Sequence, residues 1–349
     1  MITIKEIAKE CNVSITTVSN ILNGKPKASE ETRQKVMRVV EEKGYHPNYI
    51  AQGLRRQKTR MIGIIAEDIA QFTMPEVIEG IMEHCEKRNY RTIVQNLRLY
   101  SRWQDSWYDD DIRYHSVLDP ALRELRSIRA DGIIYVAGHA RILHCFLDDL
   151  RVPAVMAYAY YNTDEVPSLV LDDEQGAYEM VKYLISMGHR KIGFVGGLKD
   201  NIHEQKRLQG IKKALSEANI PFDSSLFCFG GWNRETGYRE VPKVISRGVT
   251  AVFCMADRIA GGVYDYMEEH HLSVGKDFSV AGFDNQDIAA YFKPALTTVD
   301  LPLREIGQRS AELLIDRLEA DSKQCAEGVI KIPCRLIIRD SVKKLNCDL

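Results

Sequence analysis

A short predicted helix near the N-terminus carries side chains whose types and spacing suit contact with DNA bases: Ile15, Thr16, Ser19 and Asn20. Asn pairs well with adenine, and Thr can contact a thymine methyl group or a hydrogen-bond donor. Each good bidentate pair contributes roughly 1–3 kcal/mol of discrimination between bases. Because Val18 and Ile21 are apolar at helical spacing, they are expected to face inward and to leave these side chains outside. Such a helix fits the major groove of DNA.

The residues around this helix predict a complete helix-turn-helix. Thr3 and Glu6 have the spacing of a capping box, in which a hydroxyl and a carboxylate satisfy free N–H groups at the start of a helix. Asn12 suits the left-handed backbone of the turn, and Ser14 is placed to cap the second helix. Ser29 begins a third helix. An ordinary helical hairpin that binds nothing is the alternative interpretation.

Charge is distributed unevenly along the 349 residues. The formal net charge is -2, but residues 1–60 contain 12 Lys and Arg against 6 Asp and Glu, so the rest of the chain is acidic. A basic N-terminal region joined to an acidic body is typical of a nucleic-acid-binding domain attached to a domain with another role. The length is sufficient for two or three domains.

The eight cysteines are scattered without CxxC spacing, which favours a reducing cytoplasm over a disulfide framework or a zinc site. His139, His144 and Cys145 lie near one another in the sequence, and we interpret this as coincidence. The N-terminus shows no apolar signal segment, and no run reaches ~18 apolar residues. We therefore expect a cytoplasmic protein with no metal, no cofactor and no membrane contact.

Residues 47–60 are expected to form a hinge helix and linker. Asn48 can cap a short segment that is below the length at which an isolated helix is stable in water. Within it, Leu54 is followed by two basic residues, Arg55 and Arg56.

From residue 61 onwards, apolar strands alternate with helices. Strands are expected at 61–66, 91–95, 131–137, 153–158, 168–171, 191–197, 226–229, 250–255 and 278–283. Helices are expected near 75–89, 117–129, 140–148, 175–187, 203–219, 234–247 and 257–270. Such alternation predicts parallel sheets with ligand crevices at the carboxyl ends of the strands. There are too many strands for one compact sheet, so we expect two lobes, at about 61–160 plus 293–320 and about 161–292 plus 321–341.

One stretch, Arg98 to Ser116, does not fit this pattern, because it is rich in aromatic and acidic residues where a short connection is expected. A lid, an interface loop and a solvated insertion are all compatible with it. We favour the solvated insertion.

Several groups of residues resemble the lactose-repressor/galactose-repressor (LacI/GalR) family of bacterial transcription regulators. They are Thr3–Ala8, Val13–Ser19, Tyr45–Asn48, Ala51–Leu54, Gly188–Phe194, Arg207–Gly210 and Val280–Asp284. The resemblance implies an all-α helix-turn-helix domain at residues 1–46. It further implies an α/β core at 61–349 with the two lobes and parallel sheets of the type I periplasmic-binding fold.

For the operator, the resemblance places Ile15, Thr16 and Asn20 at base edges. It places Leu54 in the minor groove, where an apolar wedge flanked by phosphate contacts of Arg55 and Arg56 fits these residue types. The alternative is that Leu54 packs on the domain behind it. Asn20 differs among relatives, so the base preference does not carry over. The full set of expected contacts with double-stranded DNA is Thr3, Ser14, Ile15, Thr16, Thr17, Ser19, Asn20, Asn48, Ala51, Leu54 and Arg55.

For a small-molecule effector between the lobes, the resemblance matches Arg207, Trp232 and Asp284 to contacts, with Asp257 close by. Arg207 and Asp284 are charge-assisted partners for hydroxyl groups, and Trp232 provides a flat apolar face for a sugar ring. The alternative for Trp232 is that it fills the core.

Candidates in the first lobe, Asp68, Phe72 and Tyr158, rest on position alone. Ala256 stands where sugar-responsive relatives often carry Asn, so the sequence departs from the family pattern there. This departure favours a larger glycoside over a monosaccharide, with its extra ring against Trp103–Tyr108.

The expected function is therefore that of a homodimeric repressor, not an enzyme, that binds a pseudo-palindromic operator and responds to a sugar or glycoside. A regulator of the same architecture that responds to a purine or another non-sugar metabolite is the alternative. A nicotinamide-dependent enzyme is disfavoured because Gly193–Gly197 is not GxGxxG. Residues 1–60 argue against a simple sugar-binding module. The chain stops soon after the strand expected at Cys334–Arg339, which leaves no room for a heptad tail that would join dimers into a tetramer.

Overall fold

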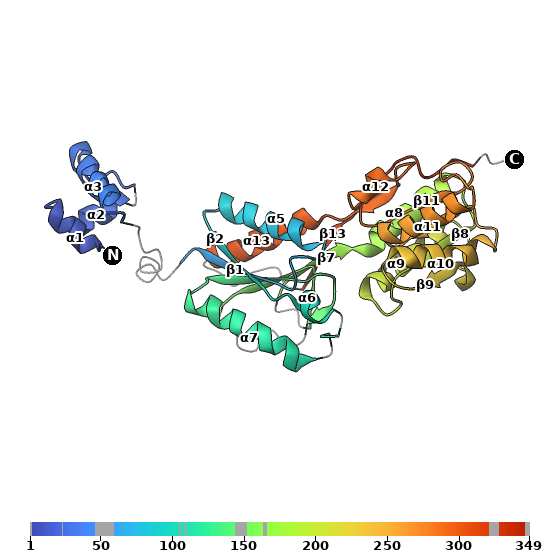
Figure 1. Cartoon of the computed structure of the whole chain (residues 1–349), viewed down its shortest axis with the longest axis horizontal. Coiled ribbons are helices and arrows are strands. Elements are labelled where there is room, and N and C mark those ends of the chain that lie inside the picture. Colours follow the sequence, from blue (N-terminus) through green and yellow to red (C-terminus); the bar gives the residue numbers. More distant parts are fainter. Residues whose placement is uncertain are drawn as a thin grey trace. The chain divides into compact units, whose positions relative to one another are not determined.

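The computed structural model divides into two compact units, Met1–Arg60 and Met61–Leu349 (Figure 1). It describes residues 2–22, 24–45, 59–104, 106–108, 110–143, 152–162, 166–320 and 328–345. Within these ranges, helices are too short or too polar to cross a membrane. Each unit is described below by itself.

The N-terminal unit contains three described helices: α1 (Ile4–Glu10), α2 (Ile15–Leu22) and α3 (Glu30–Glu42). They pack around Ile7, Val18 and Val36, whose side chains are fully buried. The α1–α2 turn contains Asn12 in the left-handed region at φ 53°, where Asn is among the better tolerated residues. The predicted helix-turn-helix is therefore present.

Local hydrogen bonds define where these helices begin. Thr3 N donates to Glu6 Oε2 at 2.7 Å and Glu6 N donates to Thr3 Oγ1 at 3.4 Å, which completes the capping box. Thr17 N donates to Ser14 Oγ at 3.0 Å at the start of α2. Ser29 accepts from Thr32 N in the same way at the start of α3.

The first lobe of the core is built on a six-stranded parallel sheet in the order β13-β7-β5-β3-β1-β2. Its strands are β1 (Met61–Ala66), β2 (Arg91–Asn96), β3 (Gly132–Val136), β5 (Ala154–Ala157), β7 (Ser168–Asp172) and β13 (Val329–Pro333). Its helices are α5 (Met74–Lys87), α6 (Leu99–Trp103), α7 (Asp111–Ser127) and α13 (Leu303–Glu319). A short pair, β4 (Ile142–Leu143) with β6 (Tyr160–Tyr161), lies beside them.

Alternate side chains of the central strand β1 enter different apolar clusters, as the two-residue period of a strand requires. Ile62 and Ile64 join the cluster that includes α5 and α13, whereas Ile65 joins the cluster of α7. Figure 1 shows α5 and α13 side by side on one face of the sheet and α7 on the other. The close approach of α5 and α13 requires Gly80 and Gly307, because a Cβ at either position would overlap the backbone of the facing helix.

The second lobe contains a four-stranded parallel sheet in the order β11-β10-β8-β9. The strands are β8 (Ile192–Gly196), β9 (Phe227–Phe229), β10 (Ala251–Cys254) and β11 (Ser279–Ala281). The helices are α8 (Asp173–Ser186), α9 (Ile202–Glu217), α10 (Arg234–Ile245), α11 (Asp257–Glu269) and α12 (Ile288–Tyr291), with a 3-10 turn at Ser224–Leu226. Helices α8 and α9 pack together, as do α10 and α11.

The lobe boundaries differ from those expected from the sequence. Residues 161–172 and 328–333 were assigned to the second lobe, but β7 and β13 pair with each other and β7 pairs with β5 in the first-lobe sheet. Strand alternation reveals that a strand exists but not which sheet it joins, because pairing is a long-range contact. An antiparallel pair, β12 (Thr298–Asp300) with β14 (Arg335–Ile337), lies where the chain passes between the lobes.

Two further expectations need correction. The segment from Arg98 to Ser116 is not a solvated insertion, because Leu99, Trp107 and Tyr114 are buried against the first lobe and Trp107 is only 3% exposed. A helix was expected at 140–148, but residues 142–143 form β4, and residues 144–148 lie outside the described part of the chain.

Candidate functional site

Helix α2 and the residue before it carry most of the described side chains that were expected to contact DNA. Ser14, Ile15 and Thr16 are exposed, and Ile15 keeps 37% of its surface accessible although it is apolar. Thr17, Ser19 and Asn20 are half-buried, and Thr3 is exposed at the start of α1. The expected hinge contacts Asn48, Ala51, Leu54 and Arg55 lie outside the described residues.

A pocket of about 400 Å³ lies between the two lobes of the core. The first lobe lines it with Gln71, Phe72, Thr73, Tyr100, Tyr108, Gly138, His139 and Tyr158. The second lobe lines it with Leu198, Asn201, His203, Arg207, Trp232, Ala256, Arg258, Asp284 and Gln286. Its volume falls within the roughly 300–1,000 Å³ of small-molecule sites.

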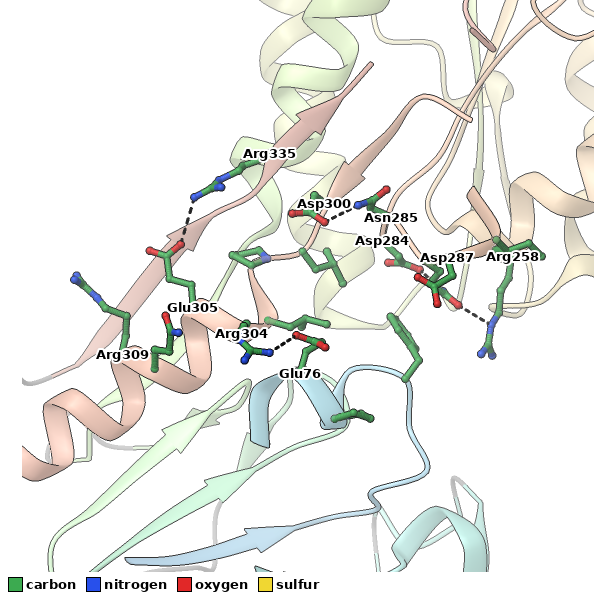
Figure 2. Close-up of a pocket in the computed structure, with 18 residues that line it drawn as sticks. Glu76, Arg258, Asp284, Asn285, Asp287, Asp300, Arg304, Glu305, Arg309 and Arg335 are labelled. Carbon is green, nitrogen blue, oxygen red and sulfur yellow. Dashed lines mark hydrogen bonds and ion pairs between the residues drawn. The ribbon is translucent and has the colours of Figure 1, made fainter. Parts of the chain in front are cut away.

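A larger and more open groove of about 1110 Å³ adjoins this pocket (Figure 2). Phe72, Arg258, Asp284 and Gln286 line both cavities. In the groove, charged side chains form ion pairs near solvent, Arg304 with Glu76 at 3.4 Å and Arg335 with Glu305 at 3.8 Å. Exposed pairs of this kind contribute little binding energy. The narrower pocket, with its aromatic faces and buried charges, is therefore the better ligand site.

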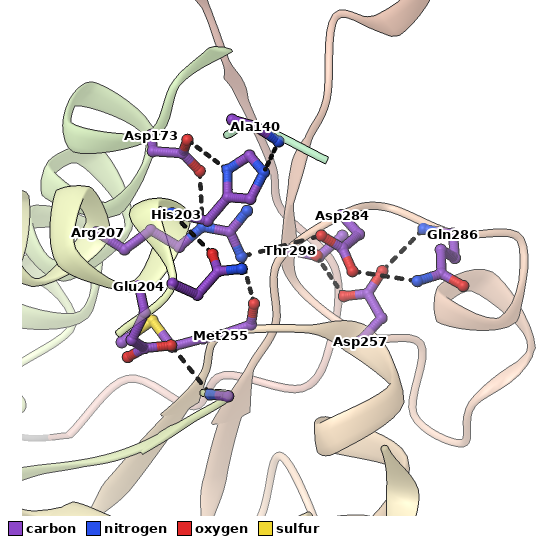
Figure 3. A network of polar contacts seen from close by, with 12 residues as sticks. Ala140, Asp173, His203, Glu204, Arg207, Met255, Asp257, Asp284, Gln286 and Thr298 are labelled. Carbon is purple, nitrogen blue, oxygen red and sulfur yellow. Dashed lines mark hydrogen bonds and ion pairs between the residues drawn. The ribbon is translucent and has the colours of Figure 1, made fainter. Parts of the chain in front are cut away.

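A buried ionic network forms the second-lobe wall of the pocket (Figure 3). Arg207 Nε donates to Asp173 Oδ1 at 2.8 Å, and Arg207 Nη1 also donates to the Met255 carbonyl. His203 Nδ1 lies 2.7 Å from Asp173 Oδ2, and its Nε2 accepts from Ala140 N of the first lobe at 3.0 Å. Burial raises the pKa of Asp173, but His203 and Arg207 outweigh this effect and hold that pKa below its usual value.

A second carboxylate, Asp284, faces the same guanidinium at 4.0 Å. Gln286 Nε2 donates to Asp284 Oδ2 at 3.1 Å. Burial raises the pKa of Asp284 to about 6, although Arg207 acts in the opposite direction. Behind it, the carboxylate of Asp257 accepts from Gln286 N at 2.8 Å and from Thr298 Oγ1 at 2.6 Å. Arg207 and Asp284 together offer a donor and an acceptor to one ligand hydroxyl group.

Flat apolar faces complete the pocket. Trp232 lies so close to Gly197 that a Cβ at that glycine would overlap the indole ring. The guanidinium of Arg207 lies 3.6 Å from the centroid of the Phe283 ring, which fixes its plane. Tyr158 has a left-handed backbone at φ 63°, a conformation that costs energy for a bulky residue and that clusters at functional sites.

Comparison with known proteins identifies the family. Residues 3–48 match the model of bacterial regulatory proteins of the lacI family, and residues 181–342 match that of a periplasmic binding protein-like domain. Catabolite control protein A of Priestia megaterium is 31% identical over 98% of this chain and 99% of its own length. This chain belongs to the lacI family of bacterial regulatory proteins. The resemblance inferred from the sequence is confirmed, and so is the predicted fold class.

Solved structures support this assignment at the level of the fold. The lac repressor dimer bound to operator and the anti-inducer ONPF superposes with a TM-score of 0.77 at 23% identity, covering 98% of this chain and 99% of that one. A LacI family regulator from Enterococcus faecium with bound ribose gives 0.64 at 27% identity, covering 82% and 100%. This lacI-family protein is a DNA-binding transcriptional repressor.

The lacI-family repressor brings most of the expected effector residues together. Phe72, Tyr158, Arg207, Trp232 and Asp284 all line the pocket.

Asp68 and Asp257 were also expected at the effector, but the structure gives them supporting contacts. Asp68 accepts from Ser101 N at 2.7 Å and from Ala70 N at 3.1 Å, so it anchors the start of α6. Asp257 is fully buried behind Asp284. Both are positioning residues.

Sequence reasoning missed Asp173, which binds Arg207, and His203, which accepts a hydrogen bond from Ala140 of the first lobe. Asp173 follows the strand β7, and a charged residue directly after a buried strand was an available signal. His203 carried no such signal in the sequence. Tyr100, Tyr108 and His139 were also not assigned individually as pocket residues.

Proposed function

We propose that this repressor is a homodimer whose affinity for a pseudo-palindromic operator is controlled by a sugar or glycoside bound in the interlobe pocket. The observation that carries this proposal is the placement of Arg207, Asp284 and Trp232 around one pocket. A guanidinium and a carboxylate bind hydroxyl groups in fixed directions, and an indole face accepts the C–H side of a sugar ring. The ribose-bound regulator of the same family is in agreement.

DNA recognition is assigned to α2 and to residues 47–60. We expect Asn20→Ala to relax the preference at one base pair in each half-site, with a cost of roughly 1–3 kcal/mol at the preferred base. Leu54→Ala is expected to lower specific affinity and DNA bending while non-specific binding stays nearly intact. Gel shifts on operators selected from random genomic fragments measure both effects. A Leu54→Ala protein that binds and bends the operator as the parent does would contradict the wedge assignment.

We expect a homodimer because one subunit presents only a small surface to the DNA bases. One short recognition helix makes few base contacts, whereas two related by a twofold axis contact two successive stretches of major groove. Light scattering of the full-length protein should therefore show a dimer. A stable tetramer, or a monomer at micromolar concentration, would contradict this.

Coupling between effector and DNA is assigned to the first lobe, because its strand β1 begins at Met61, directly after the hinge residues. Closure of the lobes around a ligand displaces the first lobes of the dimer relative to each other. A coupling free energy of ~1–3 kcal/mol is enough to change operator affinity by roughly 5–150-fold.

Trp232→Ala tests the effector half of the proposal. It is expected to weaken the effector response and to leave operator binding without effector unchanged, because the indole lies in the pocket wall. Calorimetry with a panel of sugars, sugar phosphates, purines and amino acids identifies the effector class. Binding of a purine or an amino acid with no response to any saccharide would refute the sugar assignment and leave the repressor assignment standing.

A further inference from the structure

A fully buried acidic residue, Glu67, lies directly after β1 and next to the interlobe pocket. Its Oε2 accepts from Gly138 N at 2.9 Å, and its Oε1 accepts from Tyr135 Oη at 2.9 Å. The guanidinium of Arg141 also donates to Oε1 and forms an ion pair with the carboxylate. Glu67 therefore binds both ends of the loop Gly138–Arg141.

This loop faces the pocket and the opposite lobe. Gly138 and His139 line the pocket, and Ala140 N donates to His203 Nε2 of the second lobe at 3.0 Å (Figure 3). Thr73 Oγ1, at the start of α5, donates to the Gly138 carbonyl at 2.7 Å and holds the loop from a second side. A hydrogen bond weakens steeply away from its preferred distance and angle. The position of the loop thus decides whether the bond across the cleft forms.

The aromatic segment supports the basic member of the ion pair. The guanidinium carbon of Arg141 lies 3.8 Å from the centroid of the Trp107 ring, and Trp107 is itself buried. A guanidinium over an indole face is a favourable cation–π contact, more so when it is shielded from water. The same guanidinium donates to Tyr135 Oη at 3.3 Å. Arg141 is therefore held both by the carboxylate and by a flat aromatic surface.

The two charges depend on each other because water reaches neither freely. The Glu67 side chain has no exposed surface, and that of Arg141 keeps only 15%. Each oxygen of Glu67 faces a group that can only donate, Gly138 N–H on one side and the guanidinium on the other, so the ionised carboxylate fits the site. Burial raises the pKa of Glu67, and Arg141 and Gly138 act in the opposite direction. Without the carboxylate, we expect the guanidinium to move toward solvent and to displace the loop.

We propose that the Glu67–Arg141 ion pair positions the loop Gly138–Arg141 for its hydrogen bond to His203, and so holds the two lobes together before an effector binds. This inference rests on the proposed function, because it identifies what sets the resting form of the same pocket. Glu67 and Arg141 are positioning residues: neither is among the described residues that line the pocket, and both act through the N–H group of Ala140.

Hydrogen–deuterium exchange of the full-length protein without effector tests the inference, because exchange reports the opening of individual hydrogen bonds. The measured group is the Ala140 amide, followed in peptides that span this loop. Glu67→Gln keeps an oxygen that can accept from Gly138 N but removes the charge. We expect Ala140 to exchange about 2–12-fold faster, the effect of losing one hydrogen bond. Small-angle scattering should show a more open core.

Glu240→Gln is the matched control. Glu240 is also buried and pairs with Arg239 at 3.1 Å, but it lies on α10 of the second lobe and does not line the pocket. The substitution should leave Ala140 exchange and the scattering profile unchanged. Equal changes in Glu67→Gln and Glu240→Gln would indicate a general loss of stability and overturn the inference.

A double-variant cycle with His203→Ala separates positioning from stability. If Glu67 acts through the bond from Ala140 to His203, the protein that carries both Glu67→Gln and His203→Ala should exchange at Ala140 no faster than either single variant. Effects that multiply would show that Glu67 and His203 act independently, and this result would overturn the inference.

Variants of Arg141 test the need for charge. Arg141→Lys keeps a cation opposite Glu67 and should preserve part of the protection of Ala140, whereas Arg141→Met should lose it. Combining Arg141→Met with Glu67→Gln removes both buried charges, so we expect the melting temperature to return toward that of the parent while Ala140 still exchanges rapidly. Full protection of Ala140 in this double variant would overturn the inference. Should a single variant fail to fold, the double variant decides.

The exchange measurements require no ligand, so they can fail separately from the proposed function. If no saccharide binds in calorimetry, the sugar assignment fails, and the role of Glu67 is still decided by the exchange of Ala140. If a saccharide binds and Ala140 exchanges alike in the parent and in Glu67→Gln, the sugar assignment stands and the positioning role is refuted.

Discussion

The two walls of the interlobe pocket differ in how they bind. The second-lobe wall holds Arg207 between Asp173 and Asp284, three ionisable groups that are almost completely buried. The first-lobe wall presents Tyr100, Tyr108 and a neutral His139, which hydrogen-bond to one another. A buried ionic wall fixes a ligand by strong directional bonds but tolerates truncation poorly, whereas a neutral wall can be altered with small losses. We propose that the ionic wall anchors the effector, whereas the neutral wall contributes less to its affinity.

The largest effect should come from Arg207→Met. The substitution leaves two buried carboxylates without their cation, which costs about 3–5 kcal/mol. We expect effector affinity to fall more than 100-fold and the melting temperature to drop. Calorimetry and thermal unfolding measure these two effects.

The matched control for this prediction is Arg304→Met, because Arg304 pairs with Glu76 at 3.4 Å in the larger, exposed groove. It should leave effector affinity unchanged. Equal losses in both variants would remove the distinction between the buried wall and the exposed groove.

An intermediate effect is expected from His203→Ala, because His203 is the second-lobe group that accepts a hydrogen bond from Ala140 across the cleft. Loss of the bond across the cleft is worth about 0.5–1.5 kcal/mol. The variant also removes the contact of His203 with Asp173. We therefore expect effector affinity to fall about 2–12-fold. Small-angle scattering should show a more open core, and effector should restore the closed form only at higher concentration.

His189→Ala provides the comparison, since His189 is also buried but bonds to Thr250 at 2.8 Å and to the Lys343 carbonyl at 3.1 Å within the second lobe. It should lower stability without opening the core. If both variants scatter alike, the bond to Ala140 does not hold the lobes together.

The smallest effect is a dependence of effector binding on pH between 7 and 5. Asp284, with its pKa of about 6, is ionised at pH 7 and accepts strongly from a hydroxyl group; as pH falls through 6 it becomes protonated and loses this charge-assisted bond. We expect affinity to weaken several-fold over this range, as calorimetry would show. The raised pKa means that the folded protein holds this proton more tightly than the unfolded chain, so Asp284 adds stability at low pH that is lost as pH rises through 6. Weaker binding at pH 5 would therefore not reflect unfolding driven by Asp284.

Asp284→Asn should abolish this pH dependence. His139 has a pKa of about 3, so the first-lobe wall does not titrate in this range. If effector affinity still depends on pH in the Asn variant, another group titrates, and the proposal that Asp284 binds the effector is weakened.

The structure of the N-terminal unit was predicted mainly from local sequence signals. The capping box of Thr3 and Glu6, the left-handed Asn12 and the cap at Ser14 each depend on residues within a few positions. Their geometry follows from backbone hydrogen bonding, so the sequence predicts it well. Most strands and helices of the core were predicted for the same reason, because periodicity is a local property.

Contacts between residues far apart in the sequence are not predicted by such local signals. That β7 and β13 join the first-lobe sheet, and that Asp173 and His203 meet Ala140, depends on contacts between residues far apart in sequence. The aromatic segment was expected to be a solvated insertion, because it is rich in aromatic and acidic residues where a short connection was expected. Only the packing of Trp107 reveals its place in the wall.

The sequence by itself therefore determined the helix-turn-helix, the alternating α/β core, the family, and Arg207, Trp232 and Asp284 as pocket residues. The tertiary structure alone decided that Asp68 and Asp257 support the site rather than line it, and that Tyr100, Tyr108 and His139 meet in one wall of the pocket. The physical reason is that secondary structure depends on the chemistry of near neighbours. The donors and acceptors left free toward a ligand are fixed only when distant segments have packed together and used the rest.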